Sequence, residues 1–138
     1  MKYQIEYKGQ LRCESRHKGN QCELATDAPK DNHGKGEAYS PTDLVAAALS
    51  TCMITVIGIW CRKNDVEDPK ISCTTEKVMS SDPRRIGIIY NSLIISTKEV
   101  LSSKTQAIIH RIAKECPVAQ SLHPDLKQQI SITFGIYS

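Results

Sequence analysis

The chain has 138 residues and a formal net charge of +3, with 40% hydrophobic and 24% charged residues. These values are ordinary for a soluble globular protein, and we expect a single domain over residues 1–138 with its own hydrophobic core. The charge is too small, and the basic residues are too scattered, to favour binding of nucleic acid.

Six cysteines are the residues best suited to chemistry. Their even number would fit a secreted disulfide framework, but the N-terminus has no apolar signal core and the chain is longer than most disulfide scaffolds. No two of them have the Cys-x-x-Cys spacing that is typical of a zinc site. We therefore expect a cytoplasmic protein with reduced thiols and no bound metal. The cysteines are Cys13, Cys22, Cys52, Cys61, Cys73 and Cys116.

The N-terminal segment has the alternation of a β-sheet. Tyr3, Ile5 and Tyr7 alternate with polar residues, which is the period of a strand with one buried face. Two more strands are predicted over residues 10–17 and 22–26, each after a turn that contains glycine. Three consecutive antiparallel strands are the simplest interpretation.

Residues 27–40 are polar and rich in Pro, Gly and Asn, which predicts a loop. Gly34 and Gly36 precede a helix, as glycines do in phosphate-binding loops. However, the third glycine and the Gly-Lys-Ser/Thr ending of those motifs are missing. We expect a mobile loop that lines a site.

A helix begins at the end of this loop. Ser40 can cap it, Pro41 suits its first position, and Asp43 complements the positive end of the helix dipole. The apolar pattern predicts that it continues to about Lys63.

This helix is apolar nearly all round, so protein must surround it. Residues 44–60 are at the lower length limit for crossing a bilayer, but they contain polar residues and lie between polar segments, so we expect no membrane span. A helix roughly 33 Å long is difficult for a domain of this size to enclose. We therefore expect a second copy of the chain to cover it.

The remainder of the chain predicts a hairpin, two helices and a final strand. This order favours an α+β fold with mainly antiparallel sheet and does not indicate parallel βαβ winding. The hairpin covers residues 69–79 and 86–96, the helices 103–115 and 118–122, and the strand 128–137.

Three motifs resemble those of the OsmC/Ohr family, the osmotically inducible and organic-hydroperoxide-resistance proteins. The resemblance extends over nearly the whole chain and implies an OsmC-like fold: an intertwined homodimer with two long central helices and sites at the subunit interface. The motifs are His33-Gly34 through Ser40-Pro41-Thr42-Asp43-Leu44, then Ala46-Ala47-Ala48-Leu49-Ser50-Thr51-Cys52-Met53, and Glu115-Cys116-Pro117-Val118.

Members of this family reduce organic hydroperoxides with two cysteines. By the motif match, the resemblance implies that Cys52 attacks the peroxide and becomes a sulfenic acid, and that Cys116 then forms a disulfide with it. An external dithiol would reduce that disulfide, and no cofactor is implied. The function expected from the resemblance is a thiol-dependent, antioxidant peroxidase of the stress response.

Helix geometry adds to this assignment. Cys52 and Cys61 are nine residues apart on one helix, about 180° apart around its axis, so they cannot pair while the helix persists. If Pro117 opens the short helix, Cys116 lies at its N-terminal boundary, where the dipole favours a thiolate. We assign Cys13, Cys22, Cys61 and Cys73 to packing.

In the peroxidase branch of the family an arginine from the N-terminal strands stabilises the thiolate. The resemblance implies Arg12 for this role, with Arg16 as the alternative. In that branch a glutamate directly after the helix-opening proline holds the arginine. Here Thr42 occupies that position.

Three nearby residues are candidates to line the site with Thr42. Asp43 is one position further on, about 100° around the helix, and is not an obvious replacement for the glutamate. Glu37 in the preceding loop could replace it, and His33 lies in the same loop. The alternative function is a non-peroxidase OsmC-like dimer that binds a small apolar or thiol ligand, because the activating glutamate is missing.

Overall fold

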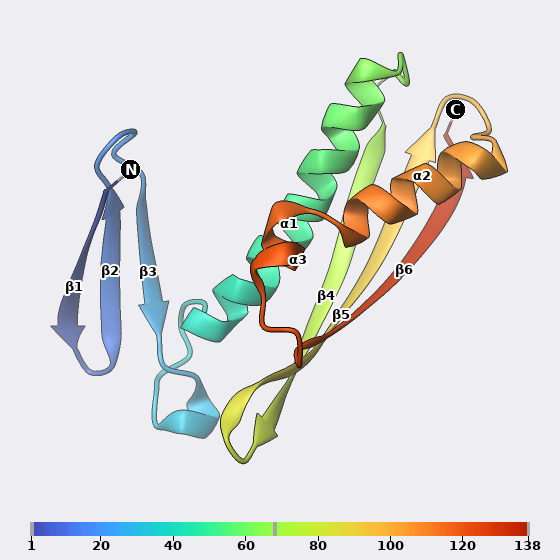
Figure 1. Ribbon diagram of the computed structural model, residues 1–138. Helices are drawn as coiled ribbons and strands as arrows, with labels where there is room; N and C mark the ends of the chain where they lie inside the picture. The colour runs from blue at the N-terminus through green and yellow to red at the C-terminus, as the bar shows by residue number, and fades with distance from the viewer. Residues whose placement is uncertain (1, 68, 138) are drawn as a thin grey trace. The chain divides into compact units, whose positions relative to one another are not determined.

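The computed structural model describes residues 2–67 and 69–137. Its contacts gather in two compact units, Met1–Val45 and Ala46–Ser138, and each is described by itself (Figure 1). One domain over the whole chain stays a prediction.

The first unit contains a three-stranded antiparallel sheet. Its strands β1 (Tyr3–Gly9), β2 (Arg12–His17) and β3 (Glu23–Asp27) are adjacent in chain order, and Figure 1 shows them as a meander. The three predicted strands are confirmed. Arg12 opens β2 directly opposite Asp27, the last residue of β3.

One face of this sheet carries exposed apolar side chains. Tyr3, Ile5 and Tyr7 are 57%, 62% and 66% exposed, and alternate residues of a strand project to the same face. Within the described chain these side chains remain exposed.

The loop that follows β3 is held by backbone contacts. It contains a 3-10 turn, η1 (Lys30–Asn32), which the composition of the loop did not predict. The N–H of Gly34 donates to the carbonyl of Pro29 at 3.0 Å, and a Cβ on Gly34 would lie 1.7 Å from the Ala28 carbonyl oxygen. Only glycine fits this close approach of two backbone segments.

The long helix α1 (Pro41–Lys63) begins where the sequence predicted. The N–H of Asp43 donates to Ser40 Oγ at 3.1 Å, and the N–H of Ser40 donates to Asp43 Oδ2 at 2.9 Å. This reciprocal pair satisfies N–H groups that the helix itself leaves unbonded.

α1 is long and apolar enough to cross a bilayer by length and composition alone. Core helices of soluble proteins meet the same criterion. Leu49, Met53 and Ile57 recur every four residues along α1 and are fully buried, as expected for a helix packed on a sheet.

The second unit contains a mixed sheet in the order β4-β5-β6. β4 (Lys70–Ser81) and β5 (Arg84–Thr97) form the predicted antiparallel hairpin. β6 (Lys127–Ile136) instead pairs with β5 in parallel. The expectation that parallel winding is absent was therefore wrong at this edge.

The connection between β5 and β6 explains the parallel pairing. It contains α2 (Ser103–Lys114) and α3 (Pro117–Ser121), and a crossover of this length returns the chain to the same end of the sheet. Figure 1 shows α2 running across this sheet.

The core of the second unit lies on one face of its sheet. On β5, Ile89, Leu93 and Ile95 are buried, whereas Tyr90 and Ile94 between them are exposed. The buried face packs in one cluster with residues of α1, α2 and α3.

Candidate active site

The second unit brings two of the predicted site residues together. Cys52 is half-buried in the middle of α1, and Cys116 is only 1% exposed directly before α3. Cys52 lies close enough to Cys116 to raise the pKa of the Cys116 thiol. Both are free thiols.

Cys116 occupies the N-cap position of α3, and Pro117 follows at the first helical position. The short helix is therefore present, and it begins at Pro117, one residue before the predicted range 118–122. The effect on ionisation differs from the expectation: burial raises the pKa of the Cys116 thiol, and Cys52 raises it further, while the backbone N–H groups of Ala119 and Val118 act in the opposite direction. Desolvation outweighs the helix dipole here because the thiol has almost no access to water.

A third thiol, Cys61, lies nine residues after Cys52 on the same helix. Cys61 is buried on α1, and its burial raises its pKa, as expected for a cysteine used in packing. Among the described residues no group of three or more His, Cys, Asp or Glu could hold a metal ion.

The first unit surrounds Arg12 with two carboxylates. Its Nε donates to Asp27 Oδ1 at 2.7 Å, and its Nη2 donates to Asp27 Oδ2 at 2.8 Å and to Glu37 Oε2 at 2.9 Å. The structure therefore brings Arg12 and Glu37 together, and Arg12 has carboxylate partners although residue 42 is threonine.

Asp27 is the member of this cluster that sequence reasoning missed. It is 2% exposed, and its Oδ2 also accepts the N–H of Glu37 at 3.0 Å. The hydrogen bond from Arg12 lowers the pKa of Asp27 to about 2, although burial opposes this shift. The same bond, with the charge of Asp27, raises the pKa of Arg12. The register of β2 against β3 would have revealed the pair, because opposite charges in directly opposed positions attract.

Of the remaining predicted site residues, Arg16, Asp43 and Thr42 have local partners. Arg16, the alternative to Arg12, forms an exposed ion pair with Glu23 at 2.8 Å. Asp43 caps α1, as described above, and Thr42 Oγ1 lies 3.1 Å from Ser40 Oγ. His33 is exposed at the end of η1.

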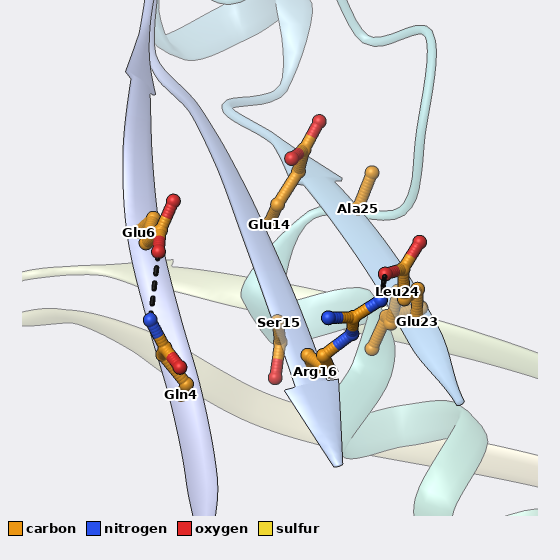
Figure 2. A pocket seen from close by; sticks show the side chains of 8 residues that line it. All are labelled: Gln4, Glu6, Glu14, Ser15, Arg16, Glu23, Leu24 and Ala25. Carbon is orange, nitrogen blue, oxygen red and sulfur yellow. Dashed lines mark hydrogen bonds and ion pairs between the residues drawn. The ribbon is translucent and has the colours of Figure 1, made fainter. Parts of the chain in front are cut away.

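A hollow of about 340 Å³ lies on the sheet of the first unit (Figure 2). Arg16 and Glu23 meet there, and Gln4 donates to Glu6 at 2.8 Å. It contains no cysteine, so it offers no thiol chemistry. Its lining residues are Gln4, Glu6, Glu14, Ser15, Arg16, Glu23, Leu24 and Ala25.

The chain is similar to a known protein family and to several solved structures. A family model described as OsmC-like protein matches residues 34–131. A solved structure from Psychrobacter arcticus, described as an osmotic stress induced and detoxification response protein, is 41% identical with a TM-score of 0.89. The match covers 95% of this chain and 94% of that one. No curated protein matches this sequence.

Two more distant structures share the fold. The organic hydroperoxide resistance protein OsmC of Legionella pneumophila is 17% identical, with a TM-score of 0.70 over 95% of this chain and 94% of that one. The organic hydroperoxide resistance protein OhrB of Bacillus subtilis is 14% identical, with a TM-score of 0.63 over 96% of each chain.

These matches confirm the resemblance on which the predictions rested, and with it the α+β, OsmC-like fold. The family model covers well over half of the chain, and the relative from Psychrobacter arcticus covers nearly all of it. This chain belongs to the OsmC-like protein family.

Proposed function

We propose that this protein is a thiol-dependent peroxidase that reduces organic hydroperoxides. The observation that carries the proposal is that Cys52 and Cys116 lie close together within the unit Ala46–Ser138, near enough for Cys52 to raise the pKa of the Cys116 thiol. The names of the relatives from Legionella pneumophila and Bacillus subtilis support the same class of substrate.

The reaction proceeds in three steps. The Cys52 thiolate attacks the terminal oxygen of the hydroperoxide, the O–O bond breaks, and the alcohol leaves with a proton, so that Cys52 becomes a sulfenic acid. Cys116 attacks the sulfur of Cys52, forms a disulfide and releases water. An external dithiol then reduces the disulfide. The reaction needs thiols that stay reduced between turnovers, as they do in a cytoplasm.

The two thiols have different environments, and this supports different roles. The raised pKa of Cys116 keeps it protonated near neutral pH, and a protonated thiol is a poor nucleophile for peroxide. Cys52 is less buried than Cys116, so peroxide reaches it first. We assign stabilisation of the Cys52 thiolate to Arg12, as the family resemblance implies, with Glu37, Thr42, Asp43 and His33 as residues that line the site.

Titration of free thiols tests this function. We expect wild type to lose two thiols after one equivalent of cumene hydroperoxide, Cys52→Ser to lose none, and Cys116→Ser to lose one as a sulfenic acid that dimedone traps. Cys22→Ser is the matched control, because Cys22 is exposed and lies outside the second unit; it should behave as wild type. Retention of all thiols in wild type would contradict the proposal.

A second function is favoured by the charge around Arg12. Two carboxylates on one guanidinium leave the cluster with a net negative charge, which weakens its attraction for a thiolate. On this basis the chain would be a dimer that binds a small apolar or thiol ligand without reducing peroxides. The thiol titration separates the two, since a binding protein keeps its thiols.

We also propose that the protein is a homodimer. Tyr3, Ile5 and Tyr7 are largely exposed on one face of the first sheet, and Ile59 on α1 is 49% exposed. Within each unit, exposed apolar side chains of this kind are typical of surfaces that a second subunit covers.

A further inference from the structure

A buried hydroxyl on α1 joins this helix to the sheet of the second unit. Thr75 Oγ1 on β4 donates to Ser50 Oγ at 2.8 Å, and it also lies 3.0 Å from Asn91 Oδ1 on β5. The proton of Ser50 goes to the carbonyl of Ala46 at 3.0 Å. Ser50 is 7% exposed and Asn91 is 1% exposed, so both ends of this network are buried, while Thr75 between them is half-buried.

An apolar residue in place of Asn91 would make the core more stable than the polar network does. The Asn91 Nδ2 atom has no hydrogen-bond partner among the described residues. Its neighbours on the same face of β5, Ile89 and Leu93, are apolar and offer no acceptor. Turning the amide by 180° would let it donate to Thr75 but would leave its oxygen in the unpartnered place. A buried amide with one unpaired end costs stability that an apolar residue would not.

Polar groups retained in a core at such a cost are best known for setting register and orientation. Here the network contacts α1 through Ser50, in the helical turn that carries Cys52. Ser50 and Cys52 are about 200° apart around the helix and roughly 3 Å apart along it. A rotation of α1 by about 20° would displace a side-chain atom at its rim by roughly 2 Å.

A displacement of this size matters for a thiol pair, because disulfide formation tolerates only a narrow range of distances and angles. We propose that Ser50, Thr75 and Asn91 are positioning residues that fix the rotation of α1 on the sheet and thereby hold Cys52 opposite Cys116. This inference rests on the proposed function, since it concerns the disulfide step. Thr75 and Asn91 belong neither to the family motifs nor to the thiol pair, and Ser50, which lies within the second motif, is given a role of its own.

Ser50→Ala is the sharpest test. Alanine favours a helix, and Thr75 keeps Asn91 Oδ1 as its acceptor, so the variant leaves no new unpaired group. The measurement is the effective concentration of Cys116 toward Cys52, obtained from the fraction of intramolecular disulfide in glutathione redox buffers. We expect Ser50→Ala to lower it about fivefold, the factor that corresponds to one ordinary hydrogen bond.

Thr55→Ala is the matched control. Its hydroxyl donates only to the α1 carbonyl of Thr51, at 2.8 Å, and is exposed, so the effective concentration should stay at the wild-type value. Thr75→Val, which keeps the shape of threonine without the hydroxyl, should lower it as Ser50→Ala does. Thr75→Ser keeps the hydroxyl that Thr75→Val removes. Its effective concentration should therefore stay within about twofold of the wild-type value, a smaller change than the loss of a hydrogen bond causes.

The experiment distinguishes failure of the positioning role from failure of the proposed function. If wild type forms the Cys52–Cys116 disulfide and folded Ser50→Ala forms it equally well, the positioning role is wrong and the proposed function stands. If wild type forms no such disulfide at any ratio of oxidised to reduced glutathione, the thiol pair itself is wrong and both proposals fall.

Discussion

Arg12 and Asp27 form a two-point ion pair, with Nε 2.7 Å from Oδ1 and Nη2 2.8 Å from Oδ2. They are direct cross-strand partners at the ends of β2 and β3. The backbone of the sheet therefore sets their geometry. Glu37, the second partner of Arg12, comes from the loop, and its side chain is 60% exposed, so it contributes little by comparison.

Asp27→Asn should destabilise the folded chain near neutral pH, because an amide cannot replace the charged partner of Arg12. The pKa of Asp27 is lowered to about 2 in the folded chain, so the folded state binds the proton less readily than the unfolded state. Its stabilisation is therefore complete above about pH 4 and disappears as pH falls toward 2. Denaturant unfolding of both proteins across this range should show the difference in unfolding free energy shrink to zero.

Glu37→Gln is the control for that experiment, since it changes a carboxylate on the same guanidinium. We expect its unfolding free energy to stay within about 1 kcal/mol of wild type. An Asp27→Asn protein as stable as wild type at pH 7 would refute the role given to the buried pair.

Gly34→Ala should disrupt the loop before α1. The added Cβ would lie 1.7 Å from the Ala28 carbonyl oxygen, and backbone atoms cannot yield as a flexible side chain can. We expect a loss of several kcal/mol, in the range of the most damaging substitutions, together with faster proteolysis between β3 and α1. Unfolding curves and limited proteolysis measure the two effects.

Gly58→Ala is the opposite case. Gly58 lies inside α1 with no atom within 4 Å of its added Cβ, so alanine should raise the unfolding free energy by about 0.5–1 kcal/mol in the isolated chain. A loss of stability instead would indicate that another subunit packs closely on this part of α1.

The buried thiols predict a loss of stability at alkaline pH. The pKa of Cys116 is raised in the folded chain, so the folded state is favoured below the ordinary thiol pKa of about 8.5 and loses stability as pH rises above it. Cys116→Ala should show a shallower decline than wild type in unfolding experiments from pH 8 upward. Cys61→Ala should do the same, since burial raises the pKa of Cys61 too. If the unfolding free energy falls equally steeply with pH in all three proteins, the buried thiols do not cause the loss of stability.

The proposed dimer can be tested with two isoleucines of similar exposure. Ile59 on α1 is 49% exposed and Ile94 on the outer face of β5 is 53% exposed. Ile59→Arg should dissociate the dimer by burying a charge in the interface, whereas Ile94→Arg should leave it intact. Sedimentation equilibrium gives both masses, and a monomeric wild type would contradict the dimer.

Much of the local structure could be predicted from the sequence. The alternation at Tyr3, Ile5 and Tyr7 predicted a strand, and Ser40 and Asp43 predicted the start of α1, because both patterns depend on neighbours within a few residues. The hairpin of β4 and β5 followed from similar local signals. The motifs around Cys52 and Cys116 also identified the family.

What the sequence determined by itself is therefore the order of the strands and α-helices and the family, since periodicity, caps and motifs are local properties of the chain. Tertiary structure alone decided that β6 pairs with β5 in parallel, that Asp27 holds Arg12, and that burial raises the pKa of Cys116. Each of these depends on groups far apart in the sequence, or on how completely water is excluded, and no local pattern encodes either.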